Sequence, residues 1–179
     1  MKNLIDRAKK FAEKKHNMPA DAQKYGNNPY SYHLKMVADV AKRYIHNIAE
    51  SDRDNVVSAC WTHDTIEDTD ASGKQIKNMF NEVVADIVMR VTNERGFDKK
   101  EVLFKTLPKI WQSELATFVK MCDRIANGHT SKNGDSEKSK RMYIRYCEEY
   151  PIFRYALKKE QYLDMWNELD EIFEYEPIK

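Results

Sequence analysis

The sequence contains little of what would keep a chain of this length extended, crosslinked or embedded in a membrane. Its 179 residues include only 5 glycines and 5 prolines, which excludes collagen-like and low-complexity classes. Its 3 cysteines are odd in number and form no C-x-x-C pair, which favours a reducing compartment over a disulfide framework. No apolar run reaches the about 18 residues of a membrane span, and the charged N-terminal segment does not resemble a signal peptide. We therefore expect a cytoplasmic protein without a membrane partner.

The sequence also lacks an excess of charge of either sign. Its 30 Lys and Arg residues oppose 29 Asp and Glu residues and leave a formal charge of +1. A surface of this kind produces no overall positive field that would attract nucleic acid, so we expect no nucleic-acid partner. An anionic ligand would have to be bound by a local group of residues.

Helical periodicity is the dominant pattern. The content of 41% hydrophobic and 33% charged residues is typical of a folded domain, which at this size buries roughly two thirds of its unfolded surface. Apolar spacing predicts helices over 2–16, 33–48, from about 53 through 68, 72–80, 83–91, 99–110, 114–127, 140–150 and 152–175. The polar segments 17–32 and 128–138 are predicted to be connections, the second a mobile loop. We predict an all-α bundle of about eight to ten helices, a single domain over residues 1–179 without strands.

The segment WTHDTIEDT at 61–69 concentrates side chains of the type that bind metals: His63, Asp64, Glu67 and Asp68. On one continuous helix, with about 100° per residue, all of them lie on the side of the preceding apolar stripe. Buried carboxylates are costly without a compensating cation, and no Lys or Arg occurs between residues 54 and 73. Either a cation binds here, or the helix ends after Asp64 and the later acids are solvated.

Two distant residues are predicted to face the same interior. His33 begins an apolar stripe, and Asp123 shares a helix face with apolar residues at 116, 119 and 126. Each alone could be an ordinary core histidine or an ion-paired aspartate. Together with His63 and Asp64 they supply two imidazoles and two carboxylates from three helices. Such a set suits a divalent transition metal with open positions, such as Mn, Fe, Co, Ni or Zn.

These residues resemble the ligand signature of the HD superfamily of metal-dependent phosphohydrolases, whose fold is all-helical. The neighbouring segments are more specific: GNNPYSYHLKMVADV and HDTIEDT resemble the Pro-Tyr, His-x-x-x-Val-Ala and HD-x-x-ED-T motifs of the Rel/SpoT hydrolase domains. IKNMFNEVVADIVMRVTNE and FVKMCDRIAN are similar to further segments of the same family. The resemblance runs in order from about residue 8 to 157 without a synthetase domain, as in the stand-alone small alarmone hydrolases of the metazoan SpoT homolog type.

The resemblance implies hydrolysis of the 3′-pyrophosphate of (p)ppGpp, a small-molecule nucleotide, to GDP or GTP and pyrophosphate, with Mn²⁺ as the cofactor. It assigns the metal to His33, His63, Asp64 and Asp123. It assigns the handling of the attacking water to Glu67 and Asp68. It implies nucleotide binding by Lys24, Tyr30 and Asn127. Further cations available for the phosphates are Lys99, Lys100, Arg124 and Lys140.

Two departures from the family pattern concern the nucleotide rather than the metal. Gln23 stands where the family has an arginine three residues before the glycine, and NMPADA at 17–22 changes the spacing after His16. Base specificity is therefore left open by the sequence.

Three functions remain as alternatives. The first is the alarmone hydrolase, and the second is an HD phosphohydrolase for another nucleotide, such as ppApp, the 2′-phosphate of NADPH or a nucleoside monophosphate. The third is a noncatalytic nucleotide-binding module, against which the presence of both Glu67 and Asp68 argues. The aromatic stripe at 162–173 is predicted either to close the bundle or to pair with another copy, which would give a homodimer.

Overall fold

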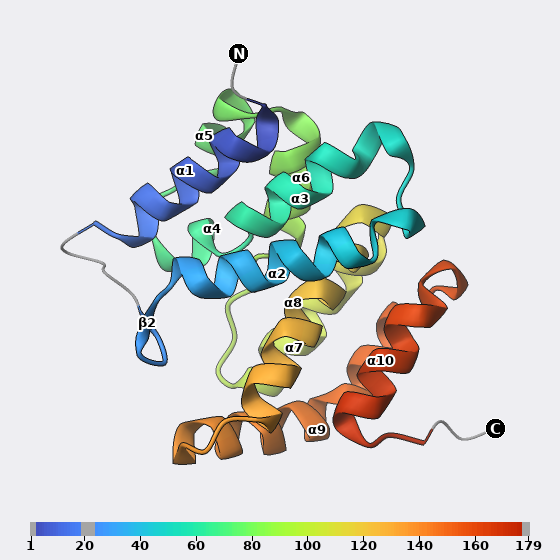
Figure 1. Cartoon of the computed structure of the whole chain (residues 1–179). Helices are drawn as coiled ribbons and strands as arrows, with labels where there is room; N and C mark the ends of the chain where they lie inside the picture. Colours follow the sequence, from blue (N-terminus) through green and yellow to red (C-terminus); the bar gives the residue numbers. More distant parts are fainter. Residues whose placement is uncertain (1–2, 19–23, 177–179) are drawn as a thin grey trace.

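Helix α8 (Glu114–Lys132) lies at the centre of the fold, with the other helices arranged around it (Figure 1). The computed structural model describes residues 3–18 and 24–176. The remaining helices in these ranges are α1 (Leu4–His16), α2 (Ser31–Arg43), α3 (Arg53–Thr62), α4 (Thr65–Asp68), α5 (Gly73–Met79), α6 (Glu82–Val91), α7 (Lys99–Trp111), α9 (Glu137–Leu157) and α10 (Leu163–Phe173). Short 3₁₀ turns occur at Ile45–Asn47, Glu50–Asp52 and Glu160–Tyr162.

The central place of α8 follows from its composition. It contacts α2, α3, α6, α7, α9 and α10. A helix that is apolar on all sides is stable only when it is surrounded, and the buried apolar residues of α8 include Ala116, Phe118, Val119, Met121, Cys122, Ile125 and Ala126. None of the helices in the described ranges combines the length and the apolar character that a membrane span requires.

The predicted all-α class is confirmed, with one local correction. The prediction of no strands is wrong at residues 24–29, where β1 (Lys24–Tyr25) pairs antiparallel with β2 (Asn28–Pro29). Gly26 reverses the chain between them with a φ of 62°, a left-handed conformation that costs glycine little. A two-residue strand gives no periodic signal in a sequence, and the hairpin was therefore hidden inside a polar connection.

The predicted start of α5 is confirmed. The Ser72 hydroxyl accepts a hydrogen bond of 3.2 Å from the backbone N–H of Gln75, which satisfies a donor that the first helical turn leaves free. Asn81 caps α6 in the same way through the N–H of Val84, at 2.9 Å.

Two boundaries predicted for the C-terminal half are wrong. Helix α8 continues to Lys132, through the first part of the segment 128–138 that was expected to form a mobile loop. Helix α9 continues through Pro151, where the sequence predicts a break. Proline removes one helical hydrogen bond, but burial of Tyr150, Phe153 and Leu157 along one face of α9 offsets this cost.

Helix α10 closes the bundle over α8 and α9. Its aromatic and aliphatic stripe is buried within the chain, at Met165, Trp166, Leu169, Ile172 and Phe173. In Figure 1 the helix runs alongside α8 and α9 at the C-terminal end of the chain. Of the two uses predicted for this stripe, closure of the core is the one observed.

Gly128 permits the close approach of α8 and α10. A Cβ at this position would lie 2.8 Å from Cγ2 of Ile172 and 3.0 Å from Cζ of Phe173, inside the packed core. We expect Gly128→Ala to destabilise the protein by about 1 kcal/mol. Overpacking destabilises by about 1–3 kcal/mol, and the higher helix propensity of alanine offsets about 1 kcal/mol of this. Urea unfolding would measure this. Gly73→Ala is the matched control, since its Cβ would meet only the flexible Met89 side chain. Equal stability of both variants would contradict the role of Gly128.

Candidate functional site

The chain changes direction at His63 and Asp64. Helix α3 ends at Thr62 and α4 begins at Thr65, so the continuous helix predicted through residue 68 is wrong. The Thr65 hydroxyl donates a 2.7 Å hydrogen bond to the Thr62 carbonyl, a local contact that competes with the helical pattern. As a result His63 and Asp64 occupy the turn between the two helices rather than one face of a single helix.

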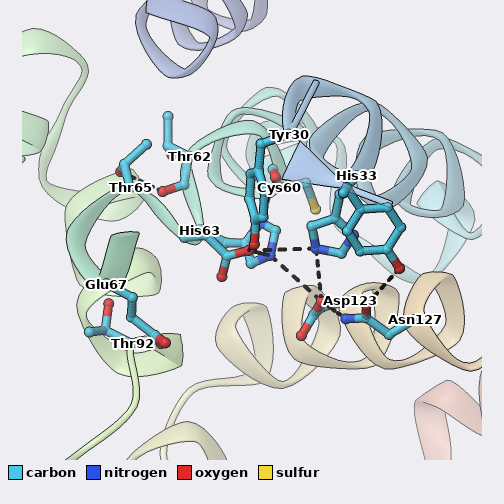
Figure 2. A network of polar contacts seen from close by, with 12 residues as sticks. Tyr30, His33, Cys60, Thr62, His63, Thr65, Glu67, Thr92, Asp123 and Asn127 are labelled. Atoms are coloured by element: carbon cyan, nitrogen blue, oxygen red, sulfur yellow. Dashed lines mark hydrogen bonds and ion pairs between the residues drawn. The ribbon is translucent and has the colours of Figure 1, made fainter. Parts of the chain in front are cut away.

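Four of the predicted site residues meet at one point. His33 lies in the first turn of α2, His63 and Asp64 lie in the α3–α4 turn, and Asp123 lies in the middle of α8. The His63 Nε2 is 2.9 Å from Asp64 Oδ2 and 3.6 Å from Asp123 Oδ1. The His33 Nε2 is 3.5 Å and 3.3 Å from the same two oxygens. Figure 2 shows His33, His63 and Asp123 pointing toward one another from separate parts of the fold.

The donor atoms are those expected of metal ligands. The His63 Nδ1 donates to the Cys60 carbonyl at 2.9 Å, which leaves Nε2 with its lone pair directed at the cluster. This Nε2 is buried and makes no hydrogen bond of acceptable geometry. The ligand atoms of His33, His63 and Asp64 lie within 4.8 Å of one another, close enough to surround one ion. The residues therefore fit a divalent metal with mixed nitrogen and oxygen ligands.

The cluster is held together by charge. Burial alone would lower the pKa of His63, but Asp64 and Asp123 outweigh it and raise the pKa well above its usual value. The same holds for His33, whose pKa is raised by hydrogen bonds to both aspartates against the effect of burial. In the opposite sense, the pKa of Asp64 falls below its usual value despite burial, because both histidines face it. A divalent cation would take the place of the histidine protons.

Each carboxylate of the cluster has further hydrogen-bond donors. The Tyr30 hydroxyl donates to Asp64 Oδ2 at 2.6 Å. Asp123 accepts from Asn127 Nδ2 at 2.6 Å and from Lys120 Nζ at 3.0 Å. Lys120 is not among the predicted site residues, although its spacing of three residues from Asp123 on one helix face is the signal that could have found it.

Arg124 directly follows Asp123 in the sequence, but it forms its ion pair with a different carboxylate. Its guanidinium donates to Glu149 at 3.0 Å and lies over the ring of Tyr146, 4.5 Å from the centroid. The carboxylate of Asp123 is thus compensated by Lys120 and the two histidines instead.

Glu67 and Asp68 lie outside the ligand cluster. Glu67 is exposed, and its carboxylate accepts hydrogen bonds from the backbone N–H and the side-chain amide of Asn93, at 2.5 and 2.9 Å. Asp68 is half-buried, and its charge contributes to the raised pKa of Tyr30, whose first cause is burial. The α3–α4 turn therefore places Glu67 at the surface, whereas Asp68 stays close enough to Tyr30 to affect its pKa.

A cavity of about 270 Å³ opens beside the cluster. Its wall includes three residues of the cluster, His33, Asp64 and Asp123. It also includes four cationic side chains, those of Lys99, Lys120, Arg124 and Arg145. Phosphate groups are bound in proteins by such charge-assisted donors. The cavity can thus receive an anionic ligand next to a bound metal.

A second cavity, of about 550 Å³, adjoins the first and shares with it Tyr25, Tyr30, Asn127, Met142 and Tyr146. Of the residues predicted to bind the nucleotide, Tyr30 and Asn127 line both cavities and Lys24 lines the second. Gln23, which carries the departure from the family pattern, falls outside the described residues.

The predicted cations are divided between the cavities and the surface. Lys99 and Arg124 line the first cavity, whereas Lys100 and Lys140 are not among the residues that line either one. Arg145 and Tyr146 were missed. They come from α9, and no local pattern in the sequence indicates that this helix faces Asp123.

The chain is similar in sequence to several guanosine-3′,5′-bis(diphosphate) 3′-pyrophosphohydrolases. It is 30% identical over 155 residues to the guanosine-3′,5′-bis(diphosphate) 3′-pyrophosphohydrolase MESH1 of Xenopus tropicalis, with 82% of each chain covered. It is 30% identical over 118 residues to MESH1 of Danio rerio, covering 65% of this chain and 63% of that protein. An Aquifex aeolicus enzyme of the same activity is 28% identical over 162 residues, which are 86% of this chain but 21% of that protein. No protein-family model matches the chain.

A solved structure has the same fold. It is described as a metazoan ortholog of SpoT that hydrolyzes ppGpp and has a role in starvation responses. The TM-score is 0.77 at 21% identity, with 97% of this chain and 96% of that chain covered.

We expect Asp64→Ala to abolish metal binding. Mn²⁺ at about 100 times its Kd should stabilise the unmodified protein by about 2.7 kcal/mol, because only the folded state brings the ligands together. In thermal unfolding experiments, Mn²⁺ should raise the Tm of the unmodified protein by several degrees. The Tm of Asp64→Ala should not respond to Mn²⁺. Asp70→Ala is the control, since this aspartate is exposed and pairs only with Lys15 among the contacts observed. A Mn²⁺ response retained by Asp64→Ala would contradict the assignment.

Proposed function

The chain belongs to the MESH1 family of guanosine-3′,5′-bis(diphosphate) 3′-pyrophosphohydrolases, and on this premise we propose that it removes the 3′-pyrophosphate of (p)ppGpp. The products are GDP or GTP and pyrophosphate. The observation that carries the proposal is the meeting of His33, His63, Asp64 and Asp123 beside a cavity lined by cations. This arrangement joins a metal-type donor set to a place for phosphate groups.

The four ligand residues would hold the metal, and Mn²⁺ is the ion we propose. Mixed imidazole and carboxylate ligands suit Mn²⁺ among the divalent transition metals. When bound, such an ion lowers the pKa of water and stabilises the charge that develops on phosphoryl oxygens.

The remaining chemistry belongs to side chains around the cluster. Water attacks the phosphorus that carries the 3′-oxygen, the bond between this oxygen and phosphorus breaks, and the 3′-oxygen gains a proton. Glu67 is the acceptor we assign to the proton of the water, and its carboxylate is oriented by Asn93, a residue of the cavity wall. Asp68, in the same short helix, is assigned to orienting the water.

The cationic wall supports binding of the phosphates. When the pyrophosphate loses its hydration on entering the cavity, its negative charge would be offset by the cations of the wall, Lys99, Lys120, Arg124 and Arg145. The ribose and base are assigned to the second cavity, where Tyr146 and Asn127 lie at the boundary and Lys24 lies at the outer side. The aromatic rings there offer faces against which a base can stack.

The substrate is tested by offering the protein several nucleotides in parallel. With Mn²⁺ present, we expect pyrophosphate release from ppGpp to be far faster than turnover of ppApp, NADPH or nucleoside monophosphates. Chromatographic separation of the products measures each rate. If another nucleotide were turned over faster than ppGpp, that nucleotide would be the substrate instead. If ppGpp were bound but no compound were turned over, the noncatalytic alternative would be favoured.

Glu67→Gln separates metal binding from turnover. The variant keeps the shape of the side chain but cannot accept a proton, so we expect kcat to fall by about 10²–10⁴-fold while the Mn²⁺ affinity is unchanged. Steady-state kinetics and a Mn²⁺ titration provide the two measurements. Glu82→Gln, an exposed glutamate paired with Lys77, is the matched control. Full activity of Glu67→Gln would remove this residue from the mechanism.

A further inference from the structure

The β1–β2 hairpin brings two tyrosine side chains to the ligand cluster. Tyr25 is the last residue of β1, and Tyr30 directly follows β2. The Tyr25 ring stacks on His33, with the centroids 4.8 Å apart and an angle of 18° between the planes. The Tyr30 ring lies between His16, on which it stacks at 4.6 Å, and His33, which it meets edge to face at 5.6 Å. Of the two histidines that these rings contact, His33 is part of the cluster, and His16 is not among the residues that line either cavity.

Tyr30 acts on Asp64 through a short hydrogen bond. Its hydroxyl is 2.6 Å from Asp64 Oδ2, the same oxygen that faces the two imidazoles. A carboxylate oxygen has two lone pairs, so the phenol can occupy one and leave the other for a cation. The bond fixes the rotation of the carboxylate, which is the usual contribution of a residue that supports a metal ligand.

Tyr25 reaches the second carboxylate through one intermediate. Its hydroxyl donates to Asn127 Oδ1 at 2.9 Å, and Asn127 Nδ2 donates to Asp123 Oδ1 at 2.6 Å. The orientation of the amide follows from the chemistry, because an ionised carboxylate accepts and does not donate. Figure 2 shows Asn127 and Asp123 side by side on the same helix.

We propose that Tyr30 is a positioning residue of the metal centre that orients Asp64, and that Tyr25 orients Asp123 through Asn127. The hairpin is then a clamp that holds both carboxylates in the geometry a metal needs. The sequence assigned Tyr30 and Asn127 to nucleotide binding, and the proposal gives both residues a role at the metal centre in addition. The Tyr30 hydroxyl already donates to Asp64, and Asn127 already donates to Asp123 and accepts from Tyr25. Hydrogen bonds to charged groups are stronger than those that a neutral ribose or base would offer. The inference rests on the metal site of the proposed function but not on the identity of the nucleotide.

The test is a titration of the chelator-treated protein with Mn²⁺ alone, without nucleotide. Tyr30→Phe removes only the hydroxyl, and we expect its Mn²⁺ affinity to fall by about 10–100-fold. Tyr25→Phe should lose less, because Asn127 keeps its contact with Asp123. Tyr155→Phe is the matched control: its side chain is 91% exposed, and its affinity should equal that of the unmodified protein.

A second readout distinguishes orientation of the metal ligand from contact with the nucleotide. At saturating Mn²⁺ the positioning role predicts that Tyr30→Phe recovers its activity with an unchanged KM for ppGpp. A nucleotide contact predicts an unchanged Mn²⁺ affinity and a raised KM, and this result would overturn the inference. Thermal unfolding in chelator checks that the variant is folded. If Tyr30→Phe does not fold, Tyr25→Phe provides the test instead, and an unchanged Mn²⁺ affinity of that variant would overturn the proposed clamp.

The proposed function and the inference can fail separately. If the unmodified protein binds Mn²⁺ and hydrolyses none of the nucleotides, the function fails, while a loss of affinity in Tyr30→Phe still supports the clamp. If the unmodified protein binds no Mn²⁺, the metal site and the clamp fail together.

Discussion

The structure depends on the pairing of two imidazoles with two carboxylates at a buried point where α2, the α3–α4 turn and α8 meet. Charged groups inside a protein are costly unless partners face them, and here each histidine lies within 3.6 Å of both aspartates. Since the partners come from three separate elements, their contact fixes how those elements pack. The same contact creates a site in which a divalent cation can replace the protons that the histidines share with the aspartates.

Other features of the fold serve this point. Helix α8 is surrounded on all sides, so Asp123 is carried deep into the bundle and is held by Lys120 and Asn127 from its own helix. Gly128, the residue that follows Asn127, lets α10 pack closely against α8 and complete the core. The α3–α4 turn places Asp64 beside His33 while Glu67 moves to the rim, within reach of Asn93. In the function that we propose, metal binding and the handling of water therefore belong to different parts of this one short segment.

Much of this could be read from particular residues. The periodic apolar positions predicted the helices, Ser72 predicted the start of α5, and the inward faces around His33 and Asp123 predicted where the ligand-type side chains meet. The break at His63 could not be predicted, because the apolar and acidic residues fit one helix equally well and the threonine hydroxyl contact that competes with it depends on local geometry. The continuation of α9 through Pro151 was also missed, since the burial of Tyr150, Phe153 and Leu157 that offsets the proline depends on how α9 packs against other helices.

The sequence by itself determined the all-helical class, the donor set and its chemical class, since these depend on residue types and on local periodicity, which a linear chain displays. Only the tertiary structure decided which donors support the ligands. Tyr30 approaches Asp64 across 34 positions and Tyr25 approaches Asn127 across 102, so no local pattern encodes these pairs. The tertiary structure also brought the cations of α7, α8 and α9 to one cavity wall. Contacts of this kind arise from the packing of whole helices, and their physical reason is the burial of apolar faces elsewhere in the molecule.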